Sequence, residues 1–378
     1  MQILIAPDSF KECLTAKEAA EAMSRGWRNI RPDDSIILFP MSDGGEGMLT
    51  TLVDATDGQY VSHLVSDPLG NLVDAQYGIL GDGETVVIEM ARAAGLHLLS
   101  ESNRNPLITS TFGVGQLAVH ALDAGYQKFI IGLGGSATND GGAGFAQALG
   151  YHLLDNTGQS LLPGGLALNS LSRIETHQRH PALDHAQFQV ACDVQAPLYG
   201  IHGASHVFGP QKGATPEMVD ALDNALQHYA CILEVTFQCA FKNIPGAGAA
   251  GGLGAGLMAF TNATMAPGTA LVAEACGLTA ALPNANLVLV AEGRLDGQSI
   301  YGKTPVGIAA LAQPHQVPVI ALAGSLGDGY EHVYEHGIQA AFSIIPAPTT
   351  LVSAMNDAAL NLERATENIA RMINLNRI

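Results

Sequence analysis

The sequence predicts an α/β protein in which a five-stranded parallel sheet domain carries a second, mixed α/β domain as an insertion. Two observations support this fold class. Two apolar runs open the chain and three close it, with helical patterns between them. The middle of the chain instead has short alternating runs broken by turn residues. Alternating strands and helices favour a parallel sheet, whereas alternating polarity favours an antiparallel meander.

The opening segment predicts a βαβα arrangement. Residues 2–6, QILIA, form an apolar run typical of a buried parallel strand. A helical pattern follows, and Thr15 with Glu18 matches the spacing of a capping box at its start. Residues 35–40 predict a second strand, and a second helix is expected from residue 48.

The middle segment differs in character from about residue 60. Residues 59–90 predict an antiparallel meander, because Pro-Leu-Gly and Gly-Asp-Gly turns separate its alternating runs. The other elements expected here are a helix at 113–124, strands at 128–132, 151–155 and 188–194, and a long helix after Thr215.

The closing segment returns to the opening pattern. Three apolar runs predict strands at 287–293, 317–325 and 340–346, and a final helix is expected at 353–373. Together with the two opening strands they make a five-stranded, flavodoxin-like sheet. We therefore expect a discontinuous domain of residues 1–60 and 265–378, with an inserted domain at 61–264.

Composition and charge exclude several classes of function. The 378 residues carry a formal net charge of −18, which disfavours nucleic acids and anionic membrane surfaces as partners. Five scattered Cys without a CxxC motif suit free thiols in a reducing compartment. The first residues lack a basic signal-peptide region. We expect a cytoplasmic protein that binds small molecules, and a homo-oligomer is allowed.

Polar loops follow three of the predicted strands. PDSFK, SDGGEG and EGRLDG each begin where an apolar run ends. Ligands of open α/β sheets bind at the carboxyl ends of the strands. Each residue alone is more often a turn or cap residue, but three such loops at one edge indicate a binding site. Its candidate residues are Asp8, Ser9, Lys11, Asp43, Glu46, Glu292, Arg294 and Asp296.

Two glycine-rich segments lie in the middle of the chain. Residues 132–144, GLGGSATNDGGAG, contain G-x-G-x-x-A after a strand, with Asp155 at the distance of a dinucleotide fingerprint. A nicotinamide-dependent dehydrogenase is therefore an alternative function. The Asn-Asp-Gly-Gly run suits a helix poorly, so a loop of amides that holds phosphates is favoured. For residues 246–256, GAGAAGGLGAG, we expect a closely packed helix start.

Residues 297–304, GQSIYGKT, match the phosphate-loop pattern G-x-x-x-x-G-K-[ST]. A phosphate loop must spring directly from a strand. The preceding strand is expected to end near Ala291, so that five residues separate it from Gly297, and the match is interpreted as accidental. Pro305 suits a helix start, and the amides there with Lys303 remain candidates for anion binding.

Seven long motifs, in the same order, give the chain its resemblance to a known family. They are APDSFKECLTAKEAA, PMSDGGEG, GLGGSATNDGGAG, CDVQAPLYG, FGPQKGATPEMV, GAGAAGGLGAGL and EGRLDGQSIYGKTPVGIA. The sequence resembles the bacterial glycerate kinases of type I over essentially its whole length, with Cys13 and Thr304 as small departures. The resemblance implies ATP-dependent phosphorylation of D-glycerate to 2-phosphoglycerate, and a flavodoxin-like domain with an inserted α/β domain.

Phosphoryl transfer requires positioning of the substrates, charge neutralisation, Mg²⁺ and a base, and each candidate residue is matched to one of these requirements. Arg294, with Arg92 as second choice, is the candidate for the glycerate carboxylate, near Asp8 and Ser9. The candidate catalytic residues are Asp193, Asp296 and Lys11. Asp43 and Glu292 are candidates for Mg²⁺. The candidates for ATP are Gly134, Gly135, Ser136, Asn139, Lys212 and Lys303. A dehydrogenase and a non-catalytic sugar-acid binding protein remain alternatives.

Overall fold

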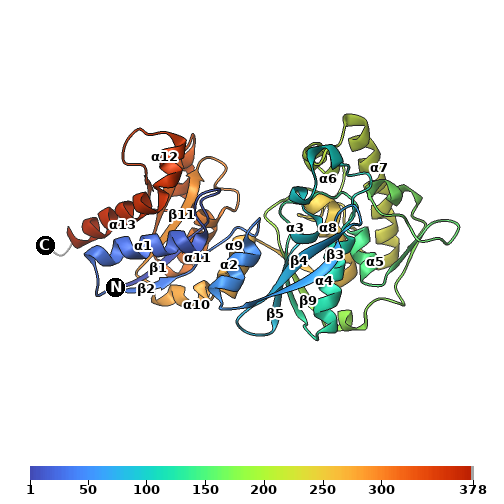
Figure 1. Cartoon of the computed structure of the whole chain (residues 1–378), viewed down its shortest axis with the longest axis horizontal. Coiled ribbons are helices and arrows are strands. Elements are labelled where there is room, and N and C mark those ends of the chain that lie inside the picture. Colours follow the sequence, from blue (N-terminus) through green and yellow to red (C-terminus); the bar gives the residue numbers. More distant parts are fainter. Residues whose placement is uncertain (376–378) are drawn as a thin grey trace. The chain divides into compact units, whose positions relative to one another are not determined.

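A computed structural model describes residues 1–375 of the chain (Figure 1). The chain forms two compact units, each with its own sheet. Unit 1 comprises residues 1–43, 50–56 and 267–378, and unit 2 comprises residues 44–49 and 57–266. No helix within residues 1–375 combines the length and the apolarity that crossing a membrane requires.

Unit 1 contains a five-stranded parallel sheet in the order β13-β12-β11-β1-β2. This is the flavodoxin-like order, in which β2 lies on one side of β1 and the three later strands lie on its other side. The predicted fold class is therefore confirmed. The strands are β1 (Gln2–Pro7), β2 (Ser35–Leu38), β11 (Leu287–Leu295), β12 (Val319–Leu326) and β13 (Ala340–Ser343).

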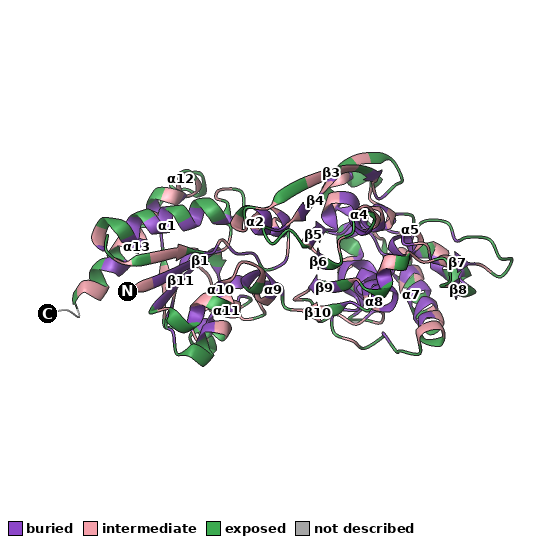
Figure 2. Cartoon of the chain, turned by 90° about the horizontal axis from the view of Figure 1, so that it is seen from below, coloured by how far each residue is buried: buried purple, intermediate pink, exposed green. Residues whose placement is uncertain are grey.

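Helices cover both faces of this sheet (Figure 2). On one face α1 packs against α13, and on the other α11 packs against β11. The core between α1, α13 and the sheet includes Ile3, Met23 and Trp27, all fully buried. The helices are α1 (Ala16–Ile30), α9 (Gly268–Ala275), α10 (Leu278–Ala281), α11 (Thr304–Ala312), α12 (Leu351–Asn356) and α13 (Ala358–Leu375), and α2 (Met48–Ala55) belongs to both units.

The start of α1 confirms the expected capping box. The Thr15 hydroxyl accepts a hydrogen bond from the Glu18 amide, and the Glu18 carboxylate accepts one from the Thr15 amide. This reciprocal pairing satisfies two amides that the helix itself leaves without a partner. The loop after β1 is thereby held in place at the edge where Asp8 lies.

Unit 2 contains a six-stranded mixed sheet in the order β10-β9-β6-β5-β4-β3. The pairs β3–β4 and β4–β5 are antiparallel, which confirms the expected meander, and the other pairs are parallel. The strands are β3 (Gln59–Ser66), β4 (Leu72–Ile79), β5 (Thr85–Glu89), β6 (Lys128–Gly132), β9 (Gln187–Ala191) and β10 (Thr264–Ala266), with a separate pair, β7 (His152–Leu154) and β8 (Arg173–Glu175).

The helices of unit 2 enclose a large apolar core against this sheet. The long helix expected after Thr215 is α7, which begins at Pro216 with Thr215 as its cap. The helices are α3 (Ala91–Ala94), α4 (Phe112–Asp123), α5 (Ala143–Ala148), α6 (Ala204–Phe208), α7 (Pro216–Phe237) and α8 (Leu253–Thr261).

The two glycine-rich segments pack directly on one another. The Gly141 amide donates to the Gly251 carbonyl, and a Cβ on Gly251 would lie 2.0 Å from the Thr138 carbonyl oxygen. A Cβ on Gly256 would lie 3.0 Å from the Gly142 Cα. Only glycine permits such a backbone approach. The second segment is therefore a closely packed helix start, as expected.

Several predicted element boundaries are wrong, and three of them bear on the site or on the last helix. β11 runs to Leu295 rather than ending near Ala291, because parallel pairing with β12 continues through Leu295 and Leu326. β9 ends at Ala191, short of the expected Val194. The final helix is divided in two at Asp357. Pairing with neighbouring strands decided the first two boundaries, and a single sequence does not reveal these pairings.

Candidate functional site

Several carboxylates of unit 1 gather at the carboxyl ends of its strands. Asp8 follows β1 directly, Glu292 lies in the last part of β11, and Asp43 follows β2. The charge of Asp43 raises the pKa of Asp8, and the charges of Asp8 and Asp296 raise the pKa of Glu292. The expected convergence of the three strand-end loops is therefore seen within this unit.

Glu292 is the most deeply buried member of this carboxylate cluster, which consists of Asp8, Asp43, Glu292 and Asp296. Glu292 is only 7% exposed, and burial raises the pKa of its carboxyl group to about 7. The Ser299 hydroxyl donates a 3.0 Å hydrogen bond to Glu292 Oε1 and accepts one from the Asp296 amide. This hydroxyl and the charge of Lys303 oppose the rise in pKa without cancelling it.

Asp8 has a similar environment. Burial, followed by the Asp43 charge, raises the pKa of Asp8 to about 6. The Thr304 hydroxyl donates to Asp8 Oδ2, and the Ser9 amide donates to Oδ1 at 2.6 Å. A carboxylate whose pKa lies near neutrality can exchange protons at physiological pH, which is a common property of functional sites.

GQSIYGKT forms the connection between β11 and α11. Because β11 reaches Leu295, only Asp296 precedes Gly297, so the spacing argument against a phosphate loop is wrong. The hydrogen bonds of the segment give a better argument. The amides of Gly297, Gln298, Ser299 and Tyr301 all donate to protein oxygens, and the Thr304 hydroxyl donates to Asp8. A phosphate loop instead directs its amides at the ligand.

Cationic side chains border the cluster. Arg294 Nε lies 3.1 Å from Asp296 Oδ2, and Lys303 Nζ lies 4.0 Å from Asp296 Oδ1. The Arg294 side chain is 64% exposed, so its guanidinium reaches solvent from the end of β11. Ser9 and Lys11 are exposed in the loop after β1. Anionic and cationic groups thus lie together at this edge.

The oxygen ligands of the cluster suit Mg²⁺. Within residues 1–375 no three His, Cys, Asp or Glu side chains are arranged to hold a metal ion. Mg²⁺ commonly uses only one or two carboxylates, together with water and substrate phosphates. The raised pKa values of Asp8 and Glu292 reflect burial and crowded negative charge, and a divalent cation would relieve the crowding.

In unit 2 the loop at residues 133–142 begins where β6 ends. Asp140, fully buried, holds this loop from within. Its carboxylate accepts hydrogen bonds from the Thr111 amide and hydroxyl and from the amides of Gly142 and Gly144. Burial raises the pKa of Asp140 although all these donors favour the charged form.

The predicted nucleotide residues of this loop differ in exposure. Gly135 is exposed and Gly134 partly exposed, whereas Asn139 is fully buried and its amide donates to the Ser205 hydroxyl. Ser136 is 8% exposed. Lys212 is 1% exposed, and its ammonium donates to the Thr138 carbonyl at 2.6 Å. Burial lowers the pKa of Lys212 to about 7, although nearby Asp140 acts in the opposite direction.

Other predicted residues lie at the same end of the unit 2 sheet. Arg92 Nε pairs with Glu89, the last residue of β5, at 3.1 Å, and Glu89 also accepts from the Leu49 amide. A Cβ on Gly134 would lie 3.0 Å from the Gly45 Cα, so the SDGGEG segment lies against the glycine-rich loop. Asp193 is partly buried two residues beyond β9.

Sequence reasoning missed three residues that position the candidate site. Ser299 and Thr304 hold two carboxylates, and Asp140 holds the glycine-rich loop. Asp140 had a usable signal, because an Asp directly before Gly-Gly is a frequent local cap of backbone amides. Ser299 had no such signal, since its partner Glu292 was assigned to a loop.

Comparisons with known proteins assign the chain to a family. The model of the glycerate kinase family matches residues 3–374. The glycerate kinase of Halalkalibacterium halodurans is 50% identical over 375 residues, 99% of each chain. This chain belongs to the glycerate kinase family. The glycerate 2-kinase of Escherichia coli K12 is 47% identical over 370 residues, which cover 98% of this chain and 97% of that protein.

A solved structure confirms the fold of this family member. A Salmonella typhimurium LT2 protein, described provisionally as a glycerate kinase 2, matches with a TM-score of 0.91 and 44% identity. The match covers 100% of this chain and 99% of that chain. The chain is therefore a kinase, a phosphotransferase with an alcohol group as acceptor. None of these matches supports a dehydrogenase or a non-catalytic binding protein.

Proposed function

We propose that the protein transfers the γ-phosphoryl group of ATP to the 2-hydroxyl of D-glycerate, giving 2-phosphoglycerate and ADP. The observation that carries this is the near full-length match to the E. coli glycerate 2-kinase at 47% identity. The carboxylate cluster at the strand ends of unit 1 supplies the chemistry that such a transfer needs.

The residues of unit 1 divide into three roles in this proposal. Asp43 and Glu292 would hold Mg²⁺, which supplies charge neutralisation for the transferred phosphoryl group. Arg294 would release Asp296 and bind the glycerate carboxylate, for which its planar fork is suited. Asp8, with Ser9 and Lys11, would orient the substrate, and Asp296 is one candidate for accepting the proton of its hydroxyl.

Unit 2 would bind the nucleotide phosphates at its glycine-rich loop. The exposed backbone at Gly134 and Gly135, with Ser136, would meet the phosphates. Lys303, in unit 1, is a separate candidate for an anionic group of the nucleotide. Lys212 and Asn139 would act indirectly, because both side chains are buried, Lys212 against the Thr138 carbonyl and Asn139 against the Ser205 hydroxyl. Arg92 is the second candidate for the substrate carboxylate, and Asp193 the second candidate for the base.

Two further expectations remain proposals. We infer a cytoplasmic location, which the five free cysteines suit because a reducing compartment preserves thiols. We also propose that the chain folds as two domains, a discontinuous one of residues 1–60 and 265–378 and an inserted one of residues 61–264.

An ADP-release assay with and without D-glycerate tests the proposed reaction. We expect ADP release that requires both D-glycerate and Mg²⁺, and that EDTA abolishes. Phosphorus NMR of the product separates 2-phosphoglycerate from 3-phosphoglycerate, so the position of transfer is decided directly. ATP hydrolysis that is unchanged by glycerate, or a 3-phosphorylated product, would contradict the proposal.

A further inference from the structure

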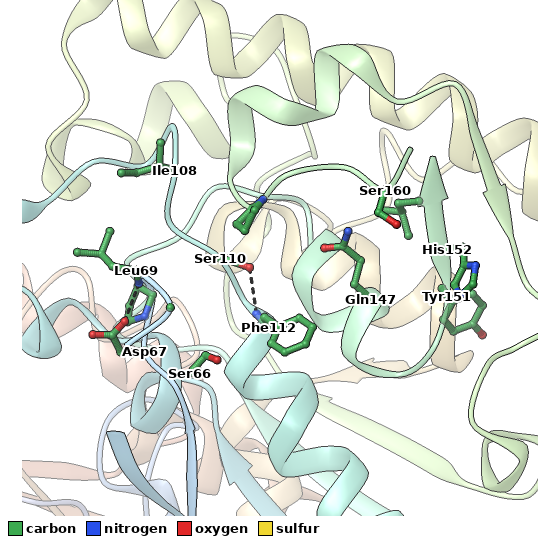
Figure 3. A pocket seen from close by; sticks show the side chains of 14 residues that line it. Ser66, Asp67, Leu69, Ile108, Ser110, Phe112, Gln147, Tyr151, His152 and Ser160 are labelled. Atoms are coloured by element: carbon green, nitrogen blue, oxygen red, sulfur yellow. Dashed lines mark hydrogen bonds between the residues drawn. The ribbon is translucent and has the colours of Figure 1, made fainter. Parts of the chain in front are cut away.

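Unit 2 contains a pocket that the proposed roles leave unused. Its volume is about 380 Å³, which is in the range of small-molecule sites. Figure 3 shows Ile108 and Leu69 on one side of it and Gln147 and Ser160 on the other, with Ser110 between them. The inference below rests on the proposed function, because it concerns the nucleotide of that reaction.

The pocket lies at the same end of the sheet as the glycine-rich loop. β3 and β5 both run antiparallel to β4, so β3 and β5 point in the same direction. β5 is in turn parallel to β6, whose end starts the glycine-rich loop. The turn that follows β3 at Ser66 lines the pocket. It therefore shares an edge with the loop proposed to hold the phosphates.

Buried hydrogen bonds tie the pocket wall to this loop. The Thr109 hydroxyl donates to the Ala137 carbonyl at 2.9 Å, and Thr111 donates twice to Asp140. Ser110 lies between these two threonines and lines the pocket. Its hydroxyl is close to α5, since a Cβ on Gly144 would lie 2.1 Å from Ser110 Oγ. The wall and the loop are thus held as one rigid element.

The charge of the lining selects the kind of ligand. Among residues 1–375 no Lys or Arg lines the pocket, and Asp67 adds a negative charge at its edge. Phosphate and carboxylate groups would be repelled there, so neither glycerate nor a phosphate chain suits this space. The ligand must therefore be uncharged or carry its negative charges outside the pocket.

The remaining lining suits a flat heterocycle with polar edges. Leu69, Ile108 and Phe112 offer apolar and aromatic surface. The Gln147 amide nitrogen donates to the Leu161 carbonyl, and within residues 1–375 its oxygen accepts no protein hydrogen bond. The Ser110 oxygen accepts from the Phe112 amide, which leaves its proton to donate. One acceptor and one donor therefore lie beside the apolar surface of the pocket, as recognition of a nucleobase requires.

We propose that this pocket binds the base of the nucleotide co-substrate, with the phosphates directed to the glycine-rich loop. The shared sheet edge, the hydrogen-bonded link through Asp140 and the absence of lining Lys or Arg among the described residues all support this arrangement. The pocket would then contribute affinity for the nucleoside part, and the loop would contribute affinity for the phosphates.

Ile108→Trp is the variant that tests this assignment. Ile108 is 51% exposed at the rim, so a larger side chain can fill the pocket without disturbing the core. Val235→Trp on α7 is the matched control, since Val235 is 79% exposed and does not line the pocket. Calorimetry with adenosine, ADP and inorganic tripolyphosphate separates the base from the phosphates.

We expect Ile108→Trp to abolish adenosine binding and to weaken ADP binding at least about tenfold, which is the loss of about 1.4 kcal/mol of contacts. Tripolyphosphate binding should be unchanged, and Val235→Trp should behave as the unmodified protein. Equal ADP and adenosine affinity in the two variants would overturn the assignment while leaving the kinase reaction intact. A protein that neither binds ADP nor phosphorylates glycerate would contradict the proposed function instead.

Photolabelling with 2-azido-ADP gives a second measurement that needs no substitution. Cross-links to peptides that contain residues 66–70, 108–112 or 147–163 are expected. Cross-links confined to other peptides would overturn the assignment, whatever the folding of the Ile108→Trp variant.

Discussion

Glu292→Gln should stabilise the protein at pH 8 while it impairs the kinase. The fold raises the pKa of Glu292 from 4.5 to about 7, chiefly through burial. At about 1.36 kcal/mol per pH unit, this rise corresponds to roughly 3 kcal/mol of folding free energy. Gln cannot ionise, and its amide oxygen can still accept the Ser299 hydrogen bond, so the substitution removes the cost of charge alone.

The sign of the effect follows from proton binding. Because the folded state binds the Glu292 proton more tightly, stability of the unmodified protein falls as pH rises from about 4.5 to about 7. The stabilisation by Glu292→Gln is therefore close to zero near pH 4.5 and complete at pH 8. Urea unfolding in EDTA at both pH values measures it.

Glu89→Gln serves as the control for this experiment. Glu89 is buried to a similar extent, 4% exposed, but Arg92 is its ion-pair partner. Its substitution should destabilise the protein at pH 8, because Gln lacks the charge that pairs with Arg92 and accepts the Leu49 amide. If the free energy of unfolding of Glu292→Gln at pH 8 is no higher than that of the unmodified protein, the electrostatic reasoning is refuted.

Three further predictions concern single side chains. Thr304→Ala should lower kcat less than about tenfold, roughly 1.4 kcal/mol of barrier, because its hydroxyl serves Asp8 in a segment whose amides are already used; a collapse of kcat in the folded variant would favour a phosphate loop. Arg294→Lys should lower kcat/KM for glycerate by roughly 2–4 kcal/mol and spare ATP binding. Equal losses in glycerate use and ATP binding, with a lower melting temperature, would mean that Arg294 serves only to pair with Asp296. Asp140→Ala should cost roughly 3 kcal/mol or more in chemical denaturation, because it strands several buried donors. Asp155→Ala is its control, because Asp155 is partly exposed and its donors lie in a surface turn; equal effects would count against the positioning role.

Local patterns in the sequence predicted the fold class and part of the site. Apolar runs of strand length predict buried strands, and the helical periods between them predict helices. The alternation of strands and helices in the parallel-sheet unit therefore followed from the sequence. The gathering of Asp8, Asp43 and Glu292 at one edge followed too, since any parallel sheet gathers the carboxyl ends of its strands.

Tertiary structure decided how far the elements extend and which hydroxyls serve which carboxylates. The polar residues at 292–294 belong to β11 because β12 supplies backbone partners through Leu326, a pairing far apart in the chain. The bond from Thr304 to Asp8 joins residues that are 296 positions apart. The burial of Lys212 is likewise set by the loop packed above it, since charge alone would have placed it in solvent. Such long-range contacts leave no periodic trace in a single sequence, so only the folded chain reveals them.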